Sequence, residues 1–119
     1  MIKQMPNTAN TEERRRFERI DITPDAQIMV LDQKGRKAGA LRQLARGGFA
    51  MEPEKSYAKD NRVYEFTIHE PMEDIRVDVR ARVRFAEPNL VGFEFVDLTP
   101  DSAVEVGVII GKYYEHNKG

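Results

Sequence analysis

The sequence predicts a mainly β fold, a small six-stranded antiparallel barrel followed by a C-terminal α-helix. Apolar and polar residues alternate over much of the chain, as they do in strands with one buried face. Short segments rich in Gly, Pro, Asp and Asn separate these stretches and indicate tight turns. Closing such strands into a barrel removes the unpaired edges that promote aggregation, so a barrel is favoured over an open sheet.

Three short strands are predicted in the first half of the chain, over residues 26–31, 37–43 and 48–52. The turn Asp32–Gly35 separates the first two, and Gly47–Gly48 separates the second from the third. Adjacent glycines permit positive φ and let a ligand approach the backbone closely. Residues 1–13 are polar without an apolar period and are expected to form a flexible tail.

The second half predicts a meander of strands over residues 63–70, 75–85 and 91–95, joined by turns at 70–74 and 87–89. Between Ile75 and Phe85 every odd position is apolar and every even position is charged. The charged face is either an ordinary solvated face with cross-strand salt bridges or an extension of a basic binding surface; it consists of Arg76, Asp78, Arg80, Arg82 and Arg84. Four aromatic residues on the apolar faces are expected in the core rather than on a base-stacking platform: Tyr64, Phe66, Phe93 and Phe95.

The C-terminal segment, residues 99–119, is predicted to be a helix. Thr99, Pro100 and Asp101 supply an N-cap hydroxyl, a proline at the first helical position and an acid in the first turn. Apolar residues then recur at helical spacing, although Val104–Val108 also alternates as a strand would. The helix is expected to pack on the barrel, which with its N-terminal loop covers residues 14–98, or on a second copy in a homodimer.

Composition excludes several classes of function. The chain has 119 residues and no cysteine, which fits one domain and excludes thiolate metal sites and cysteine nucleophiles. Its longest apolar run, Val108–Ile110, is far too short to span a membrane, so a cytoplasmic location is expected. No base stands near either serine, Ser56 or Ser102, and the two histidines are far apart, so we expect neither an enzyme nor a metal site. The net charge of −1 disfavours nucleic-acid binding by a uniformly basic surface.

Two segments are nevertheless locally basic. Four arginines stand within the six residues Arg14–Arg19, and residues 34–46 contain five basic side chains and no acid. The planar guanidinium of arginine grips phosphate, or the O6/N7 edge of guanine, through two parallel hydrogen bonds. The alternatives are a solvated junction whose arginines pair with nearby glutamates, and a plain hairpin at the glycines. We expect the two segments to converge beside one mouth of the barrel.

Together the two segments resemble a PilZ domain, over roughly Arg14 to the start of the terminal helix, with Val91–Leu98 as part of the resemblance. Arg15 and Arg19 match the family's RxxxR motif, and Arg16 is a further basic neighbour. The family's second motif, Asp/Asn-x-Ser-x-x-Gly, is similar to Gln43-x-Ala45-x-x-Gly48, in which only the glycine agrees. The resemblance implies a split-barrel type fold that binds the bacterial second messenger cyclic di-GMP, a nucleotide ligand, without metal or other cofactor. The implied ligand-binding residues are Arg15, Arg16, Arg19, Gln43, Ala45, Arg46, Gly47 and Gly48.

A receptor of this family is expected to rearrange its arginine-rich loop on binding and to signal to a protein partner in motility, exopolysaccharide production or related regulation. Two departures from the motif lower the expected affinity. Gln43 is longer than Asn and lacks the charge of Asp, and Ala45 has no hydroxyl, so affinity falls by about 10- to 1,000-fold. The alternative is a degenerate PilZ domain that does not bind cyclic di-GMP and acts as a protein-protein interaction module.

Overall fold

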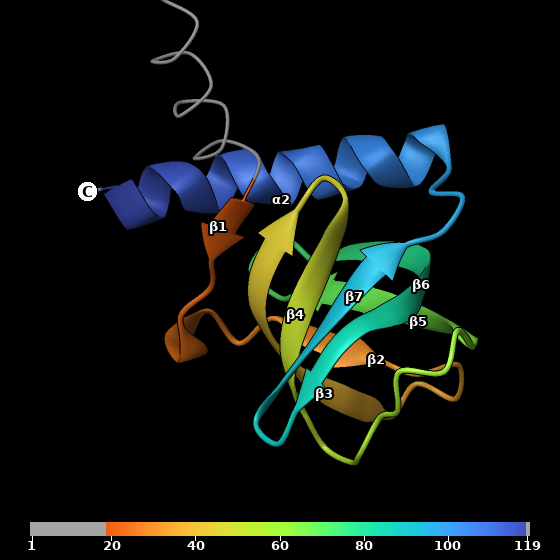
Figure 1. Cartoon of the computed structure of the whole chain (residues 1–119). Coiled ribbons are helices and arrows are strands. Elements are labelled where there is room, and N and C mark those ends of the chain that lie inside the picture. Colours follow the sequence, from red (N-terminus) through yellow and green to blue (C-terminus); the bar gives the residue numbers. More distant parts are fainter. Residues whose placement is uncertain (1–18, 119) are drawn as a thin grey trace, which may run out of the picture.

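The computed structural model describes residues 19–118 and contains a closed six-stranded antiparallel barrel, one additional strand and a C-terminal helix (Figure 1). The predicted fold class is therefore confirmed. The strands pair in the order β3-β2-β5-β6-β7-β4, and β4 pairs again with β3 to close the barrel. The predicted tail and the positions Arg14 to Glu18 lie outside the described residues. The barrel strands are β2 Met29–Leu31, β3 Lys37–Ala45, β4 Gly48–Pro53, β5 Val63–Glu70, β6 Ile75–Glu87 and β7 Leu90–Phe95.

The additional strand, β1 Arg19–Asp21, was not predicted from the alternation pattern. It pairs antiparallel with the C-terminal end of β3, while β2 pairs with the N-terminal part of the same strand. Between them the 3-10 helix η2 covers Pro24–Ala26, and Gln27 adopts a left-handed conformation with φ of 56°. The prediction that a strand begins at residue 26 is wrong, because this left-handed residue interrupts the extended chain.

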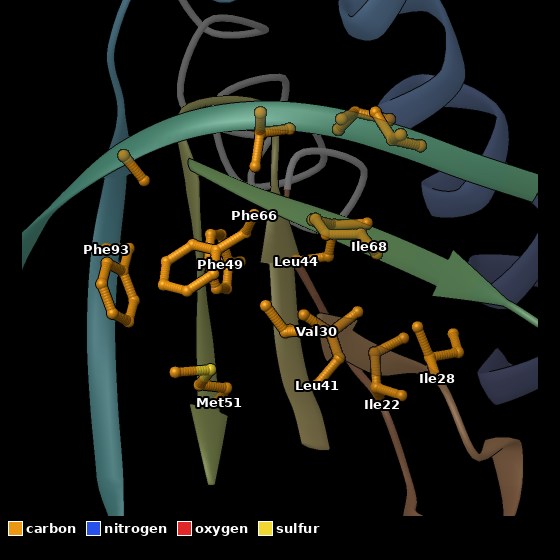
Figure 2. Close-up of a cluster of buried hydrophobic side chains, with 14 of the residues drawn as sticks. Ile22, Ile28, Val30, Leu41, Leu44, Phe49, Met51, Phe66, Ile68 and Phe93 are labelled. Carbon is orange, nitrogen blue, oxygen red and sulfur yellow. The ribbon is translucent and has the colours of Figure 1, made fainter. Parts of the chain in front are cut away.

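The core fills the barrel with aliphatic and aromatic side chains from all the strands (Figure 2). The ring of Phe49 stacks on that of Phe93 at 5.0 Å, and Phe66 meets Phe93 edge-on at 5.2 Å. Offset-stacked and edge-to-face arrangements are the favourable ones for aromatic pairs. The predicted core positions Phe66 and Phe93 are buried, and Tyr64 and Phe95 are half-buried against the same cluster.

Two β-bulges change which residues face outward. In β6 the pairing with β7 shifts between Val83 and Phe85, which makes Arg84 the extra residue. Phe85 is consequently 41% exposed, so the prediction that it continues the apolar face of this strand is wrong. In β3 the register shifts between Leu41 and Gln43, and the pattern of buried residues resumes at Leu44.

Helix α2, Pro100–Lys118, lies across one end of the barrel and contacts β6, β1 and β3 (Figure 1). The predicted N-cap is present, because the hydroxyl of Thr99 accepts the backbone N–H of Ser102 at 3.1 Å. The buried face joins the core and stabilises the packing by about 1.5–3 kcal/mol per large apolar side chain; it consists of Val106, Ile109, Ile110 and Tyr113. Within the described residues, no helix has both the length and the apolar character that crossing a membrane requires.

A buried carboxylate ties α2 to the end of β5. Glu70 has no exposed surface, and it accepts hydrogen bonds from the Tyr113 hydroxyl at 2.6 Å and from the backbone N–H groups of Met72 and Glu73 at 3.0 Å each. Nζ of Lys112 lies 3.6 Å from the same carboxylate. Burial raises the pKa of Glu70, but the three hydrogen bonds and Lys112 outweigh it and hold that pKa below its usual value. Glu70 is therefore the ionised anchor of the helix.

Replacing Tyr113 by Phe is expected to lower the free energy of unfolding by about 1.5–3 kcal/mol, because a hydrogen bond to a charged acceptor is lost. Urea denaturation measures the change. The matched control is Tyr57→Phe, since the ring of Tyr57 belongs to the core while its hydroxyl makes no hydrogen bond with the described residues and is not among their buried unpaired atoms, and its effect should stay within about 0.5 kcal/mol. Equal losses in the two variants would contradict the anchor.

The effect of Tyr113→Phe should also depend on pH. The folded pKa of Glu70 is depressed, so its stabilisation is complete above the unfolded value of about 4.3 and is lost as the pH falls through the folded value. The difference between the variant and the unchanged protein should therefore be full at neutral pH and shrink on acidification.

Candidate functional site

The outer face of the barrel beside β4 carries two rows of residues that run across five neighbouring strands. The strand register places the members of each row opposite one another. The first row crosses β1, β3, β4, β7 and β6 in the order Asp21, Gln43, Ala50, Gly92 and Phe85. The second row crosses the same strands in the order Arg19, Ala45, Gly48, Glu94 and Arg82.

The middle of these rows is a floor without long side chains. It consists of Ala45, Gly48, Ala50 and Gly92, and it underlies a cavity of about 270 Å³. A Cβ at Gly48 would lie only 2.1 Å from the carbonyl oxygen of Phe93, so the β4 and β7 backbones approach each other here as only glycine allows. Neither Gly47 nor Gly48 has positive φ, so close approach rather than turn conformation explains Gly48.

The walls of the cavity carry positive charge. Arg19 and Gln43 stand on the β1–β3 side, and Arg84 and Phe85 stand on the β6 side. Within residues 19–118, no carboxylate lines this cavity and neither arginine forms an ion pair. Two larger hollows elsewhere, of about 610 and 500 Å³, are both lined by Asp32 and Glu65, and each mixes three or more acids with one or more basic side chains. Of these three hollows, the cavity over the glycine floor is the one whose charged lining residues are all basic.

Five of the sequence-predicted site residues meet at this cavity: Arg19, Gln43, Ala45, Gly47 and Gly48. Arg46 does not line it. The guanidinium of Arg46 lies over α2 instead, with its Nη1 3.4 Å from the point that a Cβ on Gly107 would occupy. Arg15 and Arg16 precede the residues that the structure describes.

Gln43 is held in place by β1. Its Nε2 donates a long hydrogen bond of 3.4 Å to Oδ1 of Asp21, directly opposite in the register. Among the described residues, nothing donates to Oε1, the side-chain amide oxygen of Gln43. The amide therefore lies at the edge of the cavity with its acceptor available to a ligand.

The charged face of β6 divides into two parts. Three of its arginines form ion pairs, Arg76 with Asp74 at 3.4 Å, Arg80 with Asp97 at 3.8 Å and Arg82 with Glu94 at 3.0 Å. They behave as the ordinary solvated face that one interpretation of the sequence expected. Arg84, the extra residue of the β6 bulge, differs because it lines the cavity.

The two basic segments were expected to converge beside one mouth of the barrel. This prediction is wrong for most of the basic residues in segment 34–46. Lys34 and Arg36 belong to the turn before β3 and Lys37 begins that strand, whereas Ala45 ends it. An extended strand of this length separates its ends by about 27 Å. Only the C-terminal end of the second basic segment lies beside Arg19.

Sequence reasoning missed Phe85 as a cavity residue, because the strand pattern assigned it to the core. A pattern that could have revealed it is Gly92 on the neighbouring strand, since a glycine within a strand often marks a close approach. A Cβ there would lie 2.1 Å from Cε2 of Phe85, so the ring occupies the space above Gly92. No cluster of three or more metal-ligating side chains occurs among the described residues.

The comparisons with known proteins agree with this geometry. The sequence profile of the PilZ domain matches residues 13–110. The chain belongs to the PilZ domain family. The match includes both RxxxR arginines and the strands that carry Gln43, Ala45 and Gly48, so the family assignment covers the cavity as well as the barrel. No match is found among curated proteins.

Solved structures show the same fold. The PilZ domain of CeSA from a cellulose-synthesising bacterium has a TM-score of 0.56 and 19% identity, over 80% of this chain and 96% of that one. An uncharacterised Legionella protein has a TM-score of 0.58 and 13% identity, over 85% and 98% of the two chains. The Bacillus subtilis inhibitor of motility MotI has a TM-score of 0.65 and 16% identity, over 86% of this chain and 51% of MotI.

The two adjacent glycines of this PilZ domain allow a direct test of the floor. Gly48→Ala is expected to lower the free energy of unfolding by about 1–3 kcal/mol, because its Cβ would collide with a backbone oxygen that cannot rotate away. Gly47→Ala is the control, since no atom lies within 4 Å of its added Cβ, and it should change stability by less than about 0.5 kcal/mol. Thermal or urea unfolding distinguishes them, and equal effects would count against the close approach.

Proposed function

We propose that this PilZ domain is a cyclic di-GMP receptor rather than an enzyme, with the cavity beside β4 as its binding site. One observation carries the proposal. Arg19 of the first motif and Gln43, Ala45 and Gly48 of the second line the same cavity, to which the described part of the chain contributes two arginines and no carboxylate. Cyclic di-GMP has two phosphates and two guanines, which are the groups that guanidinium forks bind best.

The remaining polar groups suit the guanine base. The carbonyl of Gln43 can accept a hydrogen bond from a guanine N–H, the role that resemblance to the family assigns to its acidic or amide residue. Gly48 leaves the floor open for a flat ring. At about 270 Å³ the cavity is slightly below the range of about 300–1,000 Å³ usual for small-molecule sites, so it would enclose only part of the dinucleotide.

Arg15 and Arg16 are the residues proposed to cover the rest of the ligand. Arg15 precedes Arg19 by four positions, so an extended chain carries its Cα at most about 14 Å away. Across the floor, β4 and β7 lie between β3 and β6, so three inter-strand spacings, about 14 Å, separate β3 from β6. The two distances are similar. Arg15 is thus within reach of a ligand that lies on the floor.

Binding would then act as a switch. Contacts with the ligand would fix the arginine-rich segment relative to β1, and β1 contacts α2. Binding would therefore change the surface that a protein partner recognises. A motility or exopolysaccharide component in the cytoplasm is the kind of partner that the family resemblance suggests.

Calorimetry with cyclic di-GMP tests the proposal. The unchanged protein should bind, and Arg15→Ala or Arg19→Ala should weaken binding at least about tenfold, because each removes a charge-assisted contact. Arg76→Ala is the matched control, since Arg76 lies outside the cavity and pairs with Asp74, and it should leave affinity unchanged. Absence of binding by the unchanged protein at about 50 μM, a concentration at which even a weak site is detected, would refute the proposal.

Restoring the serine of the family motif should strengthen binding. Ala45→Ser adds a hydroxyl at the floor, and one neutral hydrogen bond is worth about 0.5–1.5 kcal/mol, or about a 2- to 12-fold gain in affinity. The control is Ala40→Ser, a half-buried position on the same strand outside the cavity. An unchanged or weaker affinity of Ala45→Ser would mean that the ligand does not lie against this position.

The second candidate is a ligand-independent interaction module. It is favoured by Val104 and Val108, which are 64% and 45% exposed on the outer side of α2 and stand one turn apart. An amide NMR titration with cyclic di-GMP separates the two functions. The receptor should show joint shifts at Arg19 and residues 45–49, and the interaction module should show none.

A further inference from the structure

The β6 side of the cavity has no counterpart in the two family motifs. Phe85 faces outward there because the bulge in β6 inserts one residue before it, whereas Arg84 already belongs to the outward, charged face of the strand. Without the bulge, the alternation that buries Val83 would also send Phe85 into the core. The bulge thus turns an aromatic ring to the outer face, next to the guanidinium of Arg84 at the edge of the cavity.

Phe85 is held but not buried. It is 41% exposed and does not belong to the core cluster, yet its ring fills the space above Gly92, where a Cβ would lie 2.1–2.6 Å from Cε2, Cδ2 and Cζ. The absence of a side chain at Gly92 therefore lets the ring pack directly on the backbone of β7. A positioned aromatic ring with one open side is the usual partner of a nucleic-acid base, since every base has a π-face to stack.

Arg84 adds charge next to this ring. Arg84 is exposed and forms no ion pair with the described residues, whereas Arg76, Arg80 and Arg82 on the same strand each pair with a carboxylate. An arginine without a carboxylate partner keeps its full set of donors for a phosphate.

We propose that Phe85 and Arg84 form a second wall of the ligand site, with Phe85 stacking on one guanine of cyclic di-GMP and Arg84 binding the adjacent phosphate. The inference rests on the proposed function and deepens it. The motif side of the cavity lacks the serine hydroxyl and the acidic or asparagine group of the family pattern. The wall on β6 supplies contacts that replace part of this loss.

Binding measurements on paired variants test the second wall. Phe85→Ala should weaken cyclic di-GMP binding by about 5- to 150-fold, the cost of removing one base–aromatic contact, whereas Phe85→Tyr should retain it. Arg84→Ala should weaken binding at least about tenfold, and Arg84→Lys by less, because lysine keeps the charge but loses the planar fork. The control Arg80→Ala changes the same strand and face outside the cavity and should bind normally.

Fluorescence provides an independent readout, because the chain contains no tryptophan. Phe85→Trp places the chain's single tryptophan on the proposed wall, and its emission, excited apart from that of the four tyrosines, should change when cyclic di-GMP stacks on it. Met72→Trp, at a 76% exposed turn position away from the cavity, should not respond.

The outcomes separate this inference from the proposed function. If the unchanged protein binds while Phe85→Ala and Arg84→Ala bind equally well and the Phe85→Trp emission is constant, the second wall is wrong and the receptor function stands. If the unchanged protein does not bind, both are overturned. Circular dichroism of each variant checks that the fold is kept. Because both side chains are exposed, we expect each variant to fold like the unchanged protein.

Discussion

The closing strand of the barrel, β4, is the constraint on which both the core and the cavity depend. It pairs with β3 on one side and with β7 on the other, so without it the sheet would have two open edges. Its inward residues, Phe49 and Met51, fill the core, and its outward residues, Gly48 and Ala50, form the middle of the cavity floor. The close contact between Gly48 and the Phe93 carbonyl fixes the spacing of β4 and β7. One strand therefore closes the barrel, packs its interior and forms the middle of the cavity floor.

The fold could be predicted largely from local patterns. Six strands and the helix follow from alternation, turn residues and capping, all of which act within a few positions of the chain. The strand β1 could not be found in this way, because Arg19–Asp21 is too short to establish a period of two. Its pairing with β3 is a long-range contact with no local trace in the sequence. The role of Glu70 is equally hidden, since it appeared to open a turn and its hydrogen-bond partner Tyr113 is 43 positions away.

The candidate site was predictable where side chains belong to a motif and not where a bulge places them. Gln43, Ala45 and Gly48 could be assigned by spacing, and the structure brings them to one cavity with Arg19. Arg46 stands within the same motif, yet its guanidinium lies beside Gly107 of α2. A bulge adds one residue and reverses the facing of every position after it, which periodicity alone cannot anticipate. That reversal is why an apolar pattern pointed Phe85 inward while the structure exposes it.

The departure of Gln43 from the family motif has a local physical reason in β1. The register sets position 43 directly opposite Asp21. An aspartate at position 43 would place two carboxylates across from each other, an arrangement that destabilises a strand pair. The neutral amide removes this repulsion and donates to Asp21 at 3.4 Å, which orients the carbonyl end of Gln43 as the acceptor left for a ligand. The replacement thus trades the stronger charged acceptor of the motif for a compatible pairing of β1 with β3, and it keeps at the cavity the strand that carries Arg19.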